Sequence, residues 1–161
     1  MPDSDTDTPS PALSAEALRK KMAEDRAAEI SQRSVADEAE FARQKAFAED
    51  FLNNHIGPDE RMHIRGLIEN AARNREYETM VYSFPSNLCT DGGRAINNAL
   101  PHWPETLQGK AREIYDLFEE VGKPLGYRFR ALVVTFPGGI PGDIGFFVSW
   151  KPPIETHRKG G

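Results

Sequence analysis

Cysteine is nearly absent from this sequence: Cys89 is the only one among 161 residues. A single cysteine excludes an internal disulfide framework and a cysteine-rich zinc site. No stretch approaches the roughly 20 apolar residues of a membrane-spanning helix. The first residues carry neither the basic region nor the apolar segment of a secretory signal. These absences predict a cytoplasmic protein of the bacterial type, with no membrane partner.

Basic charge is also in short supply. The formal net charge is −5, from 20 Lys or Arg against 25 Asp or Glu. Residues 1–55 hold 7 basic and 12 acidic residues, whereas residues 56–161 hold 13 of each. General nucleic-acid binders need a basic excess to neutralise phosphates. The charge balance therefore argues against a nucleic-acid partner, and it places the acidic excess in the first third of the chain.

Aromatic residues are scarce before His55. Only Phe41, Phe47 and Phe51 precede it, and twelve follow. A segment poor in apolar side chains cannot bury enough surface to offset the entropy of ordering the chain. The predicted organisation is a disordered tail at 1–13, an extended acidic helical segment at 14–55, a globular domain at 56–151 and a flexible tail at 152–161.

Proline and glycine are missing from Ala15 to Asn53. Strong helix formers dominate this stretch and Ser14 is placed as an N-cap, so one long helix is predicted. A break near Ser34 is the alternative, because Ser34 and Asp37 resemble a second capping box. Apolar heptads are too few and too rich in alanine for a convincing coiled coil. The helix is therefore either a solvated appendage or an interaction element.

Helical and strand patterns alternate after this helix. Pro58 begins a helix with an apolar stripe on one face. Strand-forming segments occur at 77–84, 127–136 and 144–150, and helical ones at 91–98 and 104–121. Helix-containing crossovers usually join parallel strands, whereas a seven-residue connection suits an antiparallel hairpin. The predicted fold class is α+β, with a small three-stranded mixed sheet packed by helices and preceded by the long acidic helix.

The densest local signal follows the first predicted strand. Residues 89–94 read Cys-Thr-Asp-Gly-Gly-Arg at a predicted helix start. Free backbone N–H groups, two glycines that let a ligand approach and a nearby guanidinium suit a phosphate or carboxylate. The candidate ligand-binding residues here are Thr90, Gly92, Gly93 and Arg94. The alternative is purely structural: Thr90 caps the helix and the glycines form a tight turn.

Cys89 is the candidate nucleophile of an enzymatic alternative, because a thiol at a helix N-terminus can be activated. His102 is the nearest candidate base, and Asp91 or Asp143 is the candidate orienting carboxylate. A lone cysteine is, however, commonly a small buried hydrophobic residue. The four histidines lack a metal-binding spacing, so neither a metal nor another cofactor is predicted.

A second signal is the segment Pro137–Asp143, which reads PGGIPGD. Two Pro-Gly steps favour rigid turns in which one residue has a positive φ. One interpretation is a ligand or partner loop in which Gly138, Gly139 and Asp143 take part. The other is an ordered hairpin connection.

Two functions of different classes follow from these features. The first is a non-catalytic cytoplasmic binding or assembly module that uses its N-terminal helix to bind a protein partner or a second copy. The second is a small enzyme or anionic-ligand binder with its site between the Cys89–Arg94 turn and the Pro137–Asp143 loop. A third idea, single-stranded nucleic-acid binding, needs Tyr127 and Phe129 exposed as stacking platforms. The uneven charge and the unbroken helix favour the assembly module.

Overall fold

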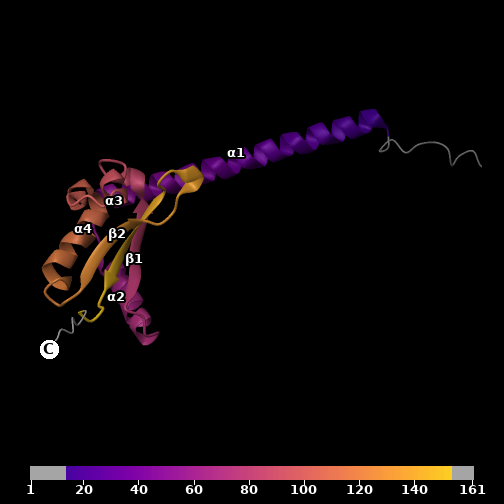
Figure 1. The fold of residues 1–161 in the computed structure, drawn as a ribbon. Coiled ribbons are helices and arrows are strands. Elements are labelled where there is room, and N and C mark those ends of the chain that lie inside the picture. The colour runs from indigo at the N-terminus through magenta and orange to yellow at the C-terminus, as the bar shows by residue number, and fades with distance from the viewer. Residues whose placement is uncertain (1–13, 154–161) are drawn as a thin grey trace, which may run out of the picture. The chain divides into compact units, whose positions relative to one another are not determined.

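A computed structural model describes residues 14–153, so the predicted tail at 1–13 and most of that at 152–161 lie outside the described residues. The helices are α1 (Ala15–Asn53), α2 (Pro58–Arg73), α3 (Arg94–Asn97) and α4 (Gly109–Leu117), and the strands are β1 (Glu78–Pro85), β2 (Arg128–Val133) and β3 (Asp143–Ser149) (Figure 1). The chain is an α+β protein with a long N-terminal helix and a small sheet, as predicted.

Helix α1 is unbroken, so the alternative of an interruption near Ser34 is not realised. No glycine or proline interrupts the ladder of backbone hydrogen bonds within it. At its start, the Ser14 hydroxyl accepts the backbone N–H of Ala17 at 3.0 Å, which confirms the predicted N-cap.

The chain divides into two compact units, one up to Phe47 and the other from Ala48 onward. The last turns of α1 belong to the second unit, which we call the globular unit. There Phe51 is fully buried, and its ring centroid lies 5.3 Å from that of Phe84. From residue 18 to Phe47, by contrast, every side chain of α1 is exposed.

The three strands form a sheet in the order β1-β3-β2, and both pairings are antiparallel. The prediction of a mixed sheet is therefore wrong in its pairing. β1 and β2 run in the same direction, but β3 lies between them and removes the parallel contact. The central strand is the most apolar one, with Ile144, Phe146 and Val148 all buried on one face. This composition is expected of β3, because the strand pairs with a neighbour on each side and one of its faces is buried.

Two predicted helices differ from the structure. The helix predicted at 91–98 with Thr90 as cap begins only at Arg94, and Gly93 occupies the N-cap position. The helix predicted at 104–121 is divided into a 3₁₀ turn at Trp103–Thr106, helix α4 and a π-helical turn, η5 (Phe118–Gly122). The chain leaves the helical conformation before α4 because Gln108 is extended, with φ −136° and ψ 165°.

The core of the globular unit is aromatic and lies on the face of the sheet that the helices cover. Phe146 is fully buried at its centre, with ring centroids 5.2 Å from Phe84 and 4.8 Å from Phe129. Trp103 stacks on Phe129 at 6.1 Å. Apolar side chains of α2 and α4 complete this core, among them Ile64, Ile68 and Ile114.

Candidate functional site

The first candidate site is the loop Cys89–Arg94, and most of its backbone donors are already used within the protein. The Asp91 carboxylate accepts the N–H of Gly93 at 2.9 Å and the N–H of Ala95 at 2.8 Å. The side chain that caps the short helix α3 is therefore that of Asp91 and not that of Thr90. Thr90 instead donates its backbone N–H to the carbonyl of Thr106 at 2.9 Å. An anion bound at this turn would have to displace a carboxylate of the protein itself. Arg94 is exposed.

The two glycines of this loop serve different ends. Both have a positive φ, 72° for Gly92 and 87° for Gly93, which side-chain-bearing residues rarely adopt. A Cβ on Gly93 would lie 2.9 Å from the Cβ of Ser86 and 3.3 Å from Cδ1 of Ile144. The absence of a side chain at Gly93 therefore allows the loop to pack closely against Ser86 and Ile144. A Cβ on Gly92 would meet open space.

Cys89 is 4% exposed, and burial raises the pKa of its thiol to about 11. A catalytic cysteine needs the opposite shift, because the thiolate is the nucleophile. His102, its candidate base, is exposed. The surroundings of Cys89 are those of a small core residue, which weakens the enzymatic alternative.

Alkylation of Cys89 by iodoacetamide at pH 8 is expected to be at least ~100-fold slower in the folded protein than in the urea-unfolded chain. A rise in pKa from 9.0 to about 11 lowers the thiolate fraction by roughly that factor, and burial slows access further. The folded rate should increase about tenfold per pH unit, because pH 8 to 10 lies below the pKa. Mass spectrometry of quenched samples measures both rates, and a folded rate close to the unfolded one would contradict the assignment.

The second candidate site is the loop Pro137–Asp143, which is held by several hydrogen bonds. The N–H of Gly142 donates to the carbonyl of Thr135 at 2.8 Å, and the N–H of Asp143 donates to the Thr135 hydroxyl at 2.8 Å. Gly138 has a φ of 62°, as the step Pro137-Gly138 predicts, and Gly139 also has a positive φ, of 81°. The second step, Pro141-Gly142, does not follow the prediction, because the φ of Gly142 is not positive. A Cβ on Gly138 or Gly139 would meet nothing within 4 Å.

The two loops meet at Ser86. Its backbone N–H donates to the carbonyl of Gly142 at 2.8 Å, and its hydroxyl donates to the carbonyl of Pro141 at 3.2 Å. On its other side, the Ser86 Cβ lies where a side chain on Gly93 would have to go. The structure thus brings the predicted site residues Gly93 and Asp143 to a common neighbourhood. They are joined there by packing and hydrogen bonds within the protein.

Tyr127 and Phe129 do not form the exposed aromatic surface that binding of a single-stranded nucleic acid would need. Tyr127 and Phe129 are only half-exposed, and the Phe129 ring packs against Trp103, Tyr115 and Phe146 in the core. Arg130 lies on the opposite face of the sheet and forms a bidentate pair with Glu78, at 2.8 and 2.7 Å. The ring of Phe129 is therefore not presented beside Arg130 as a stacking platform.

A groove that sequence reasoning missed lies between α2 and α4, with the sheet as its floor. Its volume is about 670 Å³, within the range typical of ligand sites. Neither glycine-rich loop contributes to it. The apolar residues that line it are Ile64, Ile68, Val81, Ile114, Leu117, Phe118, Val121, Leu125, Tyr127, Phe129 and Val148.

The rim of this groove is charged, and one wall is a π-helical turn. Arg61, Arg65 and Glu69 of α2 stand along the rim. The opposite wall includes η5, in which the N–H of Lys123 donates to the carbonyl of Phe118 at 2.8 Å. π-Helical turns are rare and frequent at functional sites. Hydrophobic periodicity predicted one regular helix through this region, so it gave no sign of the groove.

Lys110 is a second feature that the sequence did not reveal. It is 5% exposed, and its ammonium group lies 2.7 Å from Asp50 and 3.0 Å from each carboxylate oxygen of Glu60. Burial alone would lower the pKa of Lys110, but the hydrogen bonds that its ammonium group donates to Asp50 and Glu60 outweigh burial and raise the pKa. These contacts use the three donors of the ammonium group. We call Lys110, Asp50 and Glu60 the lysine clamp, and its role is to join the ends of three helices.

Comparison with protein-family models, with curated proteins and with solved structures finds no match to this chain. Within residues 14–153, no group of three or more His, Cys, Asp or Glu side chains is placed to hold a metal ion. Across the same residues, no helix is both long enough and apolar enough to span a membrane.

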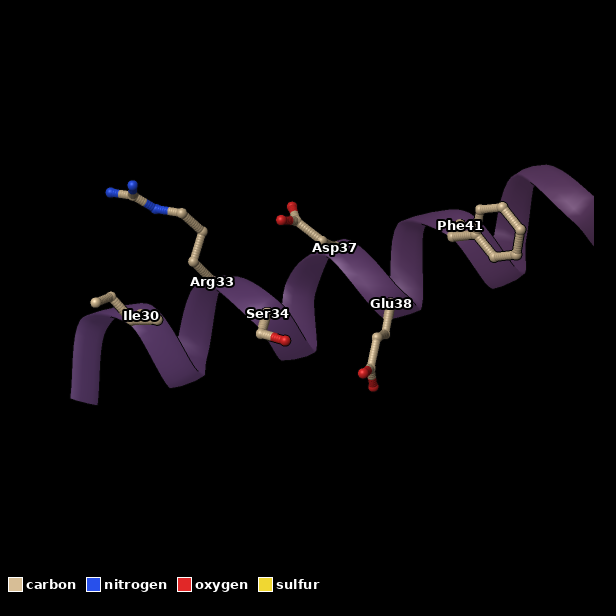
Figure 2. A pocket seen from close by; sticks show the side chains of 6 residues that line it. All are labelled: Ile30, Arg33, Ser34, Asp37, Glu38 and Phe41. Atoms are coloured by element: carbon tan, nitrogen blue, oxygen red, sulfur yellow. The ribbon is translucent and has the colours of Figure 1, made fainter. Parts of the chain in front are cut away.

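The exposed part of α1 is the remaining candidate. Figure 2 shows six of its side chains, which all come from this one helix: Ile30, Arg33, Ser34, Asp37, Glu38 and Phe41. Two large apolar side chains, Ile30 and Phe41, stand at the ends of this set, with charged and small residues between them. Such a surface has no opposing wall of its own within the first unit, so it is a ridge rather than a cavity.

Proposed function

We propose that this protein is a non-catalytic binding and assembly module that uses helix α1 to bind a protein partner or a second copy. One observation carries the proposal: from residue 18 to Phe47 every side chain of α1 is exposed, including six large apolar ones. These are Leu18, Met22, Ile30, Val35, Phe41 and Phe47. Single exposed apolar side chains are common on protein surfaces, so the proposal rests on their number along one exposed stretch of helix.

Interactions within α1 also do little to stabilise a helix of this length. Its apolar side chains are spread around the axis rather than gathered in one stripe. Exposed charge pairs such as Lys21–Asp25, at 3.6 Å, contribute only a few tenths of a kcal/mol each. Most helices in proteins gain their stability from packing on a neighbour. A partner would supply that neighbour for the exposed part of α1.

The enzymatic alternative has less support. Its nucleophile is buried with a raised pKa, and the donors of its anion site are taken by Asp91. The proposal places the protein in the cytoplasm of a bacterial-type cell, with neither a membrane nor a nucleic acid as partner.

Removing residues 1–47 is expected to abolish association. The globular unit keeps its buried core, including Phe51, so the shortened chain should remain folded. In analytical ultracentrifugation, the full chain is expected to sediment as a dimer or larger species and the shortened chain as a monomer.

Monomers in both samples would remove self-association from the proposal. A pull-down with the full chain and the shortened chain as baits then tests for a different partner. Equal capture by both baits would contradict a role for α1.

A further inference from the structure

The groove between α2 and α4 has the form of a receptor for a helix. Its floor is apolar and comes from the sheet, at Val81, Phe129 and Val148, and its walls are two helical elements. The wall residues Val121 and Leu125 are exposed, and Ile64 and Ile68 are half-exposed. Amphipathic helices bind in such grooves by inserting apolar side chains spaced by whole helical turns.

Helix α1 carries apolar side chains with that spacing. Ile30 and Phe41 are eleven residues apart, which is about three turns, so they share one face and lie ~16 Å apart along the axis. They are 60% and 68% exposed. The small side chain of Ser34 lies between them, as Figure 2 shows. The ridge therefore offers two apolar anchors separated by a short polar stretch.

The charges on the two surfaces are complementary. The ridge carries Arg33, Asp37 and Glu38 between its anchors, a net charge of −1. The rim of the groove carries Arg61, Arg65 and Glu69, a net charge of +1. The exposed ion pair between Arg65 and Glu69 is weak, with an N···O distance of 3.6 Å. Arg65 is therefore able to pair with a carboxylate of another chain. Complementary rim charges determine register and partner choice more than they add affinity.

We propose that α1 of one copy seats Ile30 and Phe41 in the groove between α2 and α4 of a second copy, with Asp37 and Glu38 facing Arg61 and Arg65. This inference rests on the proposed function and names the receptor surface for it. Reciprocal exchange of the two helices closes the contact into a two-fold dimer.

Substitutions on the ridge test the first half of the proposal in the full chain. Phe41→Glu is expected to raise the dimer dissociation constant at least tenfold, because it puts a charge at an apolar anchor. Val35→Glu is the matched control. Val35 is 64% exposed, but it lies about 140° around the helix from Ile30 and should leave the constant unchanged. Equal effects of the two substitutions would overturn the assignment of the ridge.

Substitutions on the groove test the second half. Leu125→Glu is expected to weaken the dimer at least tenfold, whereas Met62→Glu is expected to have no effect. The two side chains are 71% and 70% exposed, but only Leu125 lines the groove. Because both are already in solvent, circular dichroism should show an unchanged fold. In addition, Asp37→Arg should weaken the dimer, and combining it with Arg61→Glu and Arg65→Glu in the same chain should restore at least part of the loss.

The outcomes separate this inference from the proposed function. If removal of residues 1–47 abolishes the dimer but Leu125→Glu does not weaken it, the groove is not the receptor and the role of α1 stands. If the full chain is a monomer, the second copy is excluded as occupant. If Leu125→Glu weakens a dimer that survives the removal of residues 1–47, the groove binds something other than α1. That result overturns this inference and the self-association form of the proposed function, and the pull-down then decides whether α1 binds a different protein.

Discussion

Replacing Gly109 with alanine is expected to reduce the free energy of unfolding of the globular unit by about 3 kcal/mol or more. Gly109 begins α4 with a φ of 55°, a conformation that costs a side-chain-bearing residue about 1 kcal/mol. A Cβ there would collide with the carbonyl oxygen of Phe51 and lie 2.9 Å from its carbonyl carbon. Backbone atoms cannot rotate aside, so the end of α1 and the start of α4 would have to separate.

Chemical denaturation followed by circular dichroism measures this loss. The matched control is Gly66→Ala in α2, because a Cβ on Gly66 meets nothing within 4 Å and its φ is not positive. Alanine at an open helical position is expected to stabilise the protein by roughly 0.5–1 kcal/mol. Opposite signs at the two glycines are the expected result, and a stable Gly109→Ala variant would show that the contact with Phe51 is adjustable.

Replacing Lys110 with alanine is expected to reduce the free energy of unfolding by about 2–4 kcal/mol. Removing one member of a buried ion pair leaves its partners without a counter-charge, and shortening the side chain leaves a void. The loss stays below that of a fully buried pair because Asp50 and Glu60 are partly solvated and regain water. Lys123→Ala is the control: its pair with Glu119 is exposed, at 3.7 Å, so a loss below about 0.5 kcal/mol is expected.

The lysine clamp also predicts a dependence on pH. The folded state raises the pKa of Lys110 above its usual value of 10.5, so the clamp stabilises the protein fully below that pH and loses its contribution as the pH rises through the folded pKa. The free energies of unfolding of the protein and of Lys110→Ala should therefore differ most below pH 10.5, and the difference should shrink as the pH rises through the raised pKa of Lys110. A difference that stays constant to high pH would assign the effect to lost packing instead of charge.

Several elements were predictable because the cause of each lies in neighbouring residues. The long helix follows from the absence of glycine and proline over Ala15–Asn53, and its start follows from the Ser14 hydroxyl. Pro58 begins α2 as expected of a residue that needs no backbone donor. The positive φ of Gly138 follows from its place after Pro137.

The candidate sites were less predictable. Residues 89–94 do form a turn at a helix start. The acceptor of the N–H groups of Gly93 and Ala95 is set by the orientation of the Asp91 side chain, which the sequence does not show. A sequence pattern shows that donors exist and does not show that they are already satisfied. Similarly, the environment of Cys89 depends on burial by residues distant in the chain, and burial moves the pKa away from the value that catalysis requires.

The sequence by itself determined the fold class, the long helix, the approximate location of the three strands and the presence of turns at the two glycine-rich loops. Only the tertiary structure decided the antiparallel pairing, the lysine clamp, the close contact of Gly109 with Phe51 and the groove between α2 and α4. The physical reason is the range of the interactions. Capping, turn formation and helix propensity act over a few residues. The partners of Lys110 are instead 50 and 60 residues away, and the groove exists only because two helices on the same face of the sheet leave space between them.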